Sequence, residues 1–157
     1  MRIKIEDLNT AYEKCKDGKI VFTERIDTEL VESLIKQAKS DWKEVTEMEK
    51  LRESQTKNYS LLFCNKYDIM RKLLHALAIF DKLKPSDHKC ITAHICIKHP
   101  NYELDWNTLE TMRLLRNNVQ YRGQPINSEV YKSYKLKFQI YIFSMFGFVE
   151  KLLKKQQ

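Results

Sequence analysis

Glycine and proline are scarce in this sequence, with 3 residues of each among 157. These residues interrupt helices and form most tight turns, so their scarcity argues against a fold of many short strands. No apolar run approaches the roughly 20 residues of a membrane-spanning helix. The N-terminal MRIKIEDLNT carries charges throughout and lacks the apolar core of a secretion signal. We therefore expect a helical protein that does not enter membranes and is located in the cytoplasm.

Cysteine is also infrequent, and the four cysteines follow no disulfide framework: Cys15, Cys64, Cys90 and Cys96. Disulfides are rare in chains that stay in a reducing compartment. In a chain without an export signal, we expect all four cysteines to be free thiols.

The segment HKCITAHICIKH, residues 88–99, has several residue types that bind metals but not a suitable spacing. On one helix, Cys90 and His94 lie together, whereas His88 and His99 fall on the far side. A single ion could not reach four of these side chains. We therefore expect no metal site here and no cofactor, with buried thiols and histidines of mixed exposure instead.

The net charge of +7 is unevenly distributed. Residues 1–83 carry 16 basic and 15 acidic side chains, whereas residues 84–157 carry 12 basic and only 6 acidic ones. A basic half beside a near-neutral half indicates a surface for anions such as a nucleic acid or a nucleotide. On charge alone, a soluble protein with a basic skew that binds neither is the better explanation.

Apolar residues recur every three or four positions along most of the chain, which predicts an all-α, up-and-down bundle of five to six helices. The length fits one domain, 1–157, with a core over about 27–155 and an N-terminal helix, 1–18, packed on it. Residues 19–26 fit either an extended connector or a helical turn. We expect Ser86 to cap the fourth helix, and Asn107 with Glu110 to form a capping box for the fifth. The predicted helices span residues 5–15, 28–51, 59–83, 88–98, 107–122 and 128–154.

The last of these helices is rich in aromatic residues, including Phe138, Phe143, Phe146 and Phe148. The spacing is that of a helix packed along its length. So many rings exceed what one buried face needs, however. A second buried face would follow from pairing with another copy, so we expect a homodimer.

The stretch RLLRNNVQYRG, residues 113–123, places polar side chains on a helix anchored by an apolar face. Arg113, Asn117 and Tyr121 share one flank, because they are spaced four residues apart. Arginine suits phosphate because its planar fork donates two parallel hydrogen bonds. Tyrosine has a reference pKa near 10, so it is a poor proton acceptor at neutral pH. The spacing therefore supports anion binding and not catalysis, with these binding residues: Arg113, Arg116, Gln120 and Arg122.

The same stretch resembles the motif of the HEPN (higher eukaryotes and prokaryotes nucleotide-binding) domain superfamily, in which an arginine precedes a histidine by five to seven positions near the end of a helix. Arg116 and Asn117 match the start of this motif, and Tyr121 stands where the histidine would be. The stretch KYDIMRKLLHALAIFDKLKPSDHKCITAHI resembles the central helix and the turn that follows it, with a histidine at His88. The resemblance covers about residues 27–155.

The resemblance implies a helical bundle that dimerises so that the motif helices of two copies meet. In active relatives the shared cleft cleaves RNA without a metal, often as the toxin of a toxin–antitoxin pair or as a defence effector. Many work with a small nucleotidyltransferase partner. Carried over to this chain, the resemblance gives catalytic roles to Arg116, which would hold the scissile phosphate, to Asn117, which would support it, and to Tyr121.

Tyr121 departs from the motif at its catalytic position. Without the histidine, the chain lacks the imidazole that usually acts as the general acid or base. Two hypotheses follow. The chain is a toxin-like ribonuclease whose metal-independent activity is weakened or lost, or it is a non-catalytic binding or adaptor subunit of a nucleotidyltransferase complex. A helical bundle with no ligand is the third alternative, and it applies if Arg116 is paired inside the core.

Overall fold

The computed structural model describes residues 3–51, 58–84 and 87–157, and in these ranges it is all-helical. It contains six α-helices: α1 (Leu8–Lys16), α2 (Thr28–Leu51), α3 (Tyr59–Phe80), α4 (His88–Lys98), α5 (Trp106–Arg122) and α6 (Ser128–Lys155). A short 3-10 helix, η1 (Pro100–Tyr102), joins α4 to α5. The predicted all-α bundle is confirmed.

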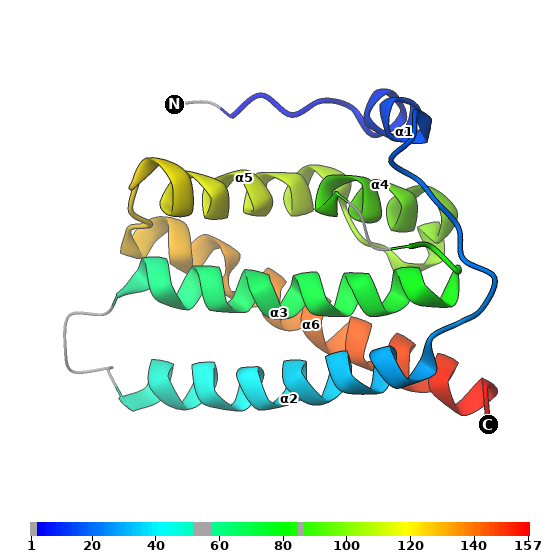
Figure 1. Cartoon of the computed structure of the whole chain (residues 1–157). Coiled ribbons are helices and arrows are strands. Elements are labelled where there is room, and N and C mark those ends of the chain that lie inside the picture. The colour runs from blue at the N-terminus through cyan, green and yellow to red at the C-terminus, as the bar shows by residue number, and fades with distance from the viewer. Residues whose placement is uncertain (1–2, 52–57, 85–86) are drawn as a thin grey trace.

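Helix α3 is the centre of the bundle, because α2, α4, α5 and α6 all pack against it. Its 22 residues include thirteen that are buried, among them Phe63, Met70 and Leu74. In Figure 1, α3 and α6 run in one direction and α2 and α5 run in the other. The N-terminal segment and α1 lie over α4 and α5 on the outside of the bundle (Figure 1).

The connector between α1 and α2 is extended rather than helical, which decides between the two alternatives for residues 19–26. Phe22 forms an isolated β-bridge with Leu83, just after α3. The backbone N–H of Thr23 donates to the Lys82 carbonyl at 2.7 Å, and that of Lys84 donates to the Val21 carbonyl at 2.7 Å. The connector is therefore fixed to the end of α3.

Several helix ends differ from the predictions, and the first helix begins at Leu8 instead of residue 5. Helix α5 begins at Trp106 and is capped by Asp105, whose carboxylate accepts from the Thr108 backbone N–H at 2.8 Å, so the predicted capping box at Asn107 is wrong. Asp87 caps α4 by accepting from the Lys89 N–H, and Ser86, the predicted cap, lies outside the described residues. Helix α3 ends at Phe80 instead of 83, because the chain turns through a left-handed residue at Lys82.

The cysteine prediction is wrong for two of the four residues. Cys15 of α1 and Cys90 of α4 form a disulfide, with Cα atoms 5.6 Å apart. Packing of α1 on α4 brings them together across 75 residues of sequence, which no local spacing reveals. Cys64 and Cys96 are free and buried, as expected.

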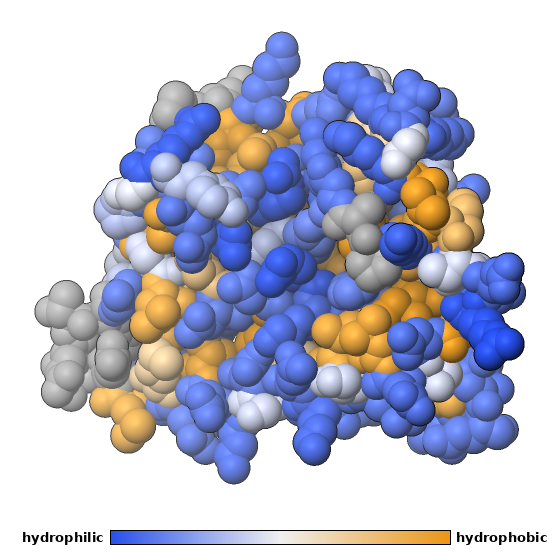
Figure 2. All heavy atoms as spheres, viewed as in Figure 1, coloured by the Kyte–Doolittle hydropathy of each residue, from blue (hydrophilic) through white to orange (hydrophobic). Residues whose placement is uncertain are grey.

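The face of the molecule in Figure 2 is mostly hydrophilic, with apolar residues gathered in separate patches. Among the described residues, no helix is both long enough and apolar enough to cross a membrane.

Candidate anion-binding site

Helix α5 carries the predicted site residues and is capped at both ends. At its start, Asp105 caps the helix. At its end, Gly123 adopts a left-handed conformation (φ 63°), and its N–H donates to the Asn118 carbonyl. Leu109 and Met112 are buried, and Leu115 and Val119 are half-buried against the core. The apolar face expected for this helix is therefore present, and the polar residues lie along its other sides.

Arg113 is held by an internal partner. Its Nε donates to Oε2 of Glu110 at 2.9 Å and its Nη2 donates to Oε1 at 2.7 Å, so the guanidinium binds the carboxylate through two hydrogen bonds. The Glu110 side chain is only 3% exposed. This hydrogen-bonded pair raises the pKa of Arg113, against the effect of burial. The charge of Arg113 is therefore balanced by Glu110, and its best donors are already used.

Arg116 is paired less completely. Its Nη2 lies 3.3 Å from Oδ1 of Asp68 on α3, as an ion pair without hydrogen-bond geometry. Its Nη1 donates to the Asn117 side-chain oxygen at 3.5 Å, and its Nε is buried with no hydrogen-bond partner. Asp68 is also shared with Arg71, whose Nε lies 3.8 Å away. The Arg116 side chain is 19% exposed, so it lies at the edge of the core with unused donors.

The other predicted residues lie further out along α5. Asn117 is half-buried, whereas Gln120, Tyr121 and Arg122 are exposed. Tyr121 is 79% exposed, so its hydroxyl is open to solvent and is not enclosed with the Arg116 guanidinium. The polar residues predicted on α5 therefore do not form one site. Arg116 and Asn117 are partly buried, whereas Tyr121 lies on the surface.

A groove of about 250 Å³ runs beside these residues, between the first half of α3 and the end of α5. Burial raises the pKa of the Cys64 thiol at this groove, with Gln120 and Arg116 acting in the opposite direction. Asp68 connects the groove to the Arg116 guanidinium. The groove is smaller than most pockets for drug-sized ligands, and the charged side chain in its described lining is the carboxylate of Asp68. It is lined by Asn58, Ser60, Leu61, Cys64, Asn65, Asp68, Val119 and Gln120.

The structure adds residues that sequence reasoning did not assign to the site. His88, at the start of α4, lies near a basic cluster formed by Arg71, Arg113 and Arg116. Both ring nitrogens of His88 are buried with no hydrogen-bond partner. In the sequence, only the resemblance to HEPN domains pointed to His88, because no spacing along the chain relates residue 88 to residues of α5.

The protonation of these groups favours binding over proton transfer. Burial, followed by the charges of the basic cluster, lowers the pKa of His88 to about 3. Burial also raises the pKa of Tyr67, whose ring meets that of His88 edge-to-face at 5.5 Å between centroids. Both groups are therefore uncharged at neutral pH, and neither changes its protonation there.

The histidines of residues 88–99 serve other contacts. His94 and His99 each hydrogen-bond through Nε2 to the same oxygen of Asp81, at 2.9 and 2.7 Å. Burial raises the pKa of Asp81, but the two imidazoles more than offset that effect and the net pKa is lowered. Within the described ranges, no group of three or more histidine, cysteine, aspartate or glutamate side chains is arranged to hold a metal ion.

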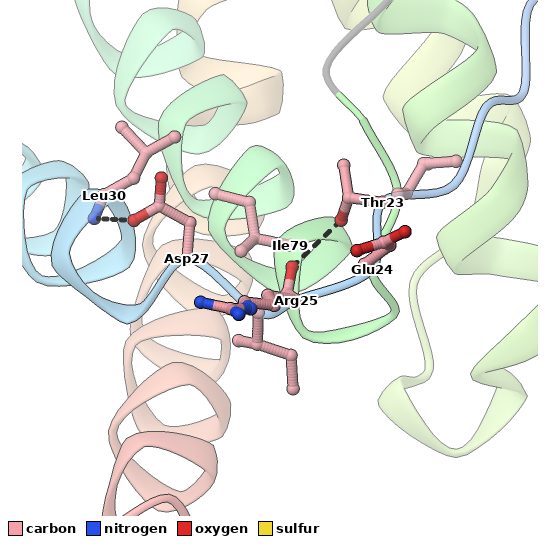
Figure 3. Close-up of a pocket in the computed structure, with 8 residues that line it drawn as sticks. Thr23, Glu24, Arg25, Asp27, Leu30 and Ile79 are labelled. Atoms are coloured by element: carbon pink, nitrogen blue, oxygen red, sulfur yellow. Dashed lines mark hydrogen bonds between the residues drawn. The ribbon is translucent and has the colours of Figure 1, made fainter.

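A larger hollow of about 590 Å³ lies at the other end of α3, under the connector (Figure 3). Ile26, Leu30, Ile79 and Leu83 make its surface mainly apolar. Two of its polar groups are occupied locally: the Thr23 hydroxyl donates to the Arg25 carbonyl, and Asp27 accepts from the Leu30 N–H. It therefore offers space without a set of converging polar groups.

Comparison with protein-family models, with curated proteins and with solved structures gives no match to this chain.

Proposed function

We propose that this protein is a HEPN-like RNA- or nucleotide-binding protein, a toxin-like or effector component of a toxin–antitoxin or nucleotidyltransferase-associated system. Its phosphate site is the protected end of α5. The proposal rests above all on Arg116, whose Nε has no hydrogen-bond partner and whose guanidinium lies beside Asp68, a residue that lines the groove. Arg71 is a second basic side chain near it, and the charge excess of residues 84–157 has the same sign.

Between the two activities, the structure favours binding without cleavage. RNA cleavage without a metal needs groups that accept and donate protons near neutral pH. His88 has a pKa of about 3 and Tyr121 is 79% exposed on the surface. We therefore favour the non-catalytic binding or adaptor subunit of a nucleotidyltransferase complex over the ribonuclease.

The site is tested by measuring the affinity for single-stranded RNA and for a mononucleotide with Arg116→Ala. Loss of one arginine that contacts phosphate is expected to weaken binding by about tenfold. Arg25→Ala is the matched control, because Arg25 is an exposed arginine beside the hollow at the far end of α3. Unchanged affinity of the Arg116→Ala protein would overturn the site.

The choice between the two activities is tested by incubating the purified protein with RNA in a chelating buffer. We expect intact RNA, together with stable co-purification of a nucleotidyltransferase when the two are expressed together. Metal-independent cleavage that disappears in Arg116→Ala would instead establish the ribonuclease.

A further inference from the structure

A second group of charged residues is buried between α2, α3 and α6, away from the α5 groove. Lys66 of α3 and Glu49 of α2 form an ion pair at 3.1 Å, with side chains 2% and 10% exposed. The Tyr131 hydroxyl of α6 donates to the same carboxylate at 2.7 Å. A buried ion pair pays a large desolvation cost and is a weak source of stability. Its presence here calls for a further role.

Aromatic rings surround the buried ammonium. The Lys66 Nζ lies 5.5 Å from the centre of the Trp42 ring and 5.2 Å from that of Tyr131. Both distances are within cation–π range. Trp42 also meets Phe143 edge-to-face, with ring centres 5.5 Å apart. Phe143 is 50% exposed, so this aromatic wall continues from the core to the surface.

A hollow of about 390 Å³ opens over this group. Helix α2 contributes Trp42, Thr46, Glu49 and Lys50, α3 contributes Lys66, and α6 contributes Lys135, Gln139 and Phe143. The volume is in the range of sites for small organic ligands. The hollow combines a charged floor, an aromatic wall and a polar rim, in contrast to the apolar hollow under the connector.

Among the described residues that line this hollow, three carry an ammonium group and one a carboxylate: Lys50, Lys66, Lys135 and Glu49. Burial raises the pKa of Glu49, but the hydrogen bond from Tyr131 and the charges of Lys66 and Lys135 more than offset it, so the net pKa is lowered. Glu49 is therefore ionised at neutral pH and already has three partners, at 2.7, 3.1 and 3.3 Å. Lys50 and Lys135 also line the hollow, where an anionic ligand would meet their ammonium groups.

We propose that this hollow is a binding site for a small aromatic anion, meaning a planar ring that carries a phosphate or a carboxylate group. The ring lies against Trp42 and Phe143, and the anionic group is held by Lys135 and Lys50 at the rim. The ion pair of Lys66 and Glu49 forms the floor beneath the ligand. The site is separate from the one at Arg116 and does not depend on it.

The probes are adenosine monophosphate and benzoate, each measured by isothermal titration calorimetry against the intact chain. Inorganic phosphate and adenosine are measured alone as the separate halves of the nucleotide. We expect saturable binding of at least one aromatic anion, at least tenfold tighter than either half. Which probe binds identifies the anionic group as phosphate or carboxylate. If neither probe binds, the proposal is wrong.

Two variants locate the binding. Lys135→Gln is expected to weaken it at least tenfold, and Phe143→Leu, which keeps an apolar side chain but removes the ring, at least threefold. Both side chains are at least half exposed, so the fold should be retained. Lys137→Gln is the matched control, because Lys137 is an exposed lysine of the same helix that donates to Thr108 instead of lining the hollow.

Arg116→Ala separates this site from the α5 site. The aromatic anion should bind this variant with unchanged affinity even if RNA binding is lost. If Arg116→Ala abolishes binding while Lys135→Gln leaves it intact, the ligand occupies the α5 groove and the proposal for the hollow is overturned.

Discussion

His88 is the residue whose chemistry is most altered by its surroundings. Both ring nitrogens are buried without a hydrogen-bond partner, and three arginines lie near the ring. Burial acts first and the arginine charges second, and together they lower the pKa from 6.5 to about 3. The imidazole is therefore kept neutral in the folded protein and becomes protonated readily only on unfolding.

This shift predicts a pH dependence of stability. The unfolded chain takes up a proton at His88 below about pH 6.5, whereas the folded chain does so only near pH 3, so acidification favours unfolding across that window. The contribution is fully present above the unfolded pKa, and about 2 kcal/mol of it is lost between pH 7.5 and pH 5. Denaturant unfolding of wild type and His88→Gln at these two values should show a smaller loss in the variant. Equal losses would mean that His88 is protonated in the folded state.

At the scale of elements, α1 depends on a few contacts that connect it to α4 and α5. The disulfide between Cys15 and Cys90 is one. Trp106 at the start of α5 donates through Nε1 to the Glu6 carbonyl at 2.8 Å, and Lys89 pairs with the Glu6 carboxylate at 3.0 Å. The disulfide is the covalent link among these contacts and closes a loop of 75 residues, so it restricts the unfolded chain strongly.

Reduction of this disulfide should lower stability by about 2–4 kcal/mol, because the 75-residue loop regains its freedom in the unfolded state. Thermal unfolding with and without a thiol reductant measures the effect. The double variant Cys15→Ser, Cys90→Ser is the control, since it should unfold at a lower temperature and no longer respond to the reductant. A wild-type protein insensitive to the reductant would show that α1 is held by its other contacts.

At the scale of the whole molecule, the surface of α6 bears on assembly. Phe138 is buried, and Phe146 and Phe148 pack against the core, so most of the predicted aromatic excess is used within one copy. Leu136 and Ile140 remain 65% and 51% exposed and share one face of the helix. This exposed stripe supports the proposed homodimer, through α6 rather than through the α5 helices implied by the HEPN resemblance.

The dimer is tested by the mass in solution, measured by light scattering after size-exclusion chromatography. Wild type is expected at twice the chain mass, and Ile140→Glu at the mass of one chain, because a carboxylate would be buried in the apolar contact. Val21→Glu is the matched control, since Val21 is 46% exposed on the connector, far from α6 in sequence. A single-chain mass for wild type would leave the stripe as ordinary surface.

The helices were predictable because their signals are local. Apolar residues of α6 recur at helical spacing, and Asn127 caps the helix by accepting from the Val130 N–H, so its bounds differ from the prediction only at the last residue. The Asn107 prediction failed although the signal was of the right kind, because Asp105 offered a stronger carboxylate cap two residues earlier.

The sequence by itself determined the helical class, most helix bounds and the apolar face of α5, because these depend on backbone hydrogen bonds and on a period of 3.6 residues. Only the tertiary structure decided which side chains meet. Arg116 lies at Asp68, Cys15 is bonded to Cys90, and Tyr131 donates to Glu49 across 82 residues of sequence. Such pairings follow from how the helices pack around α3, and helix packing depends on contacts along whole faces that no short motif encodes.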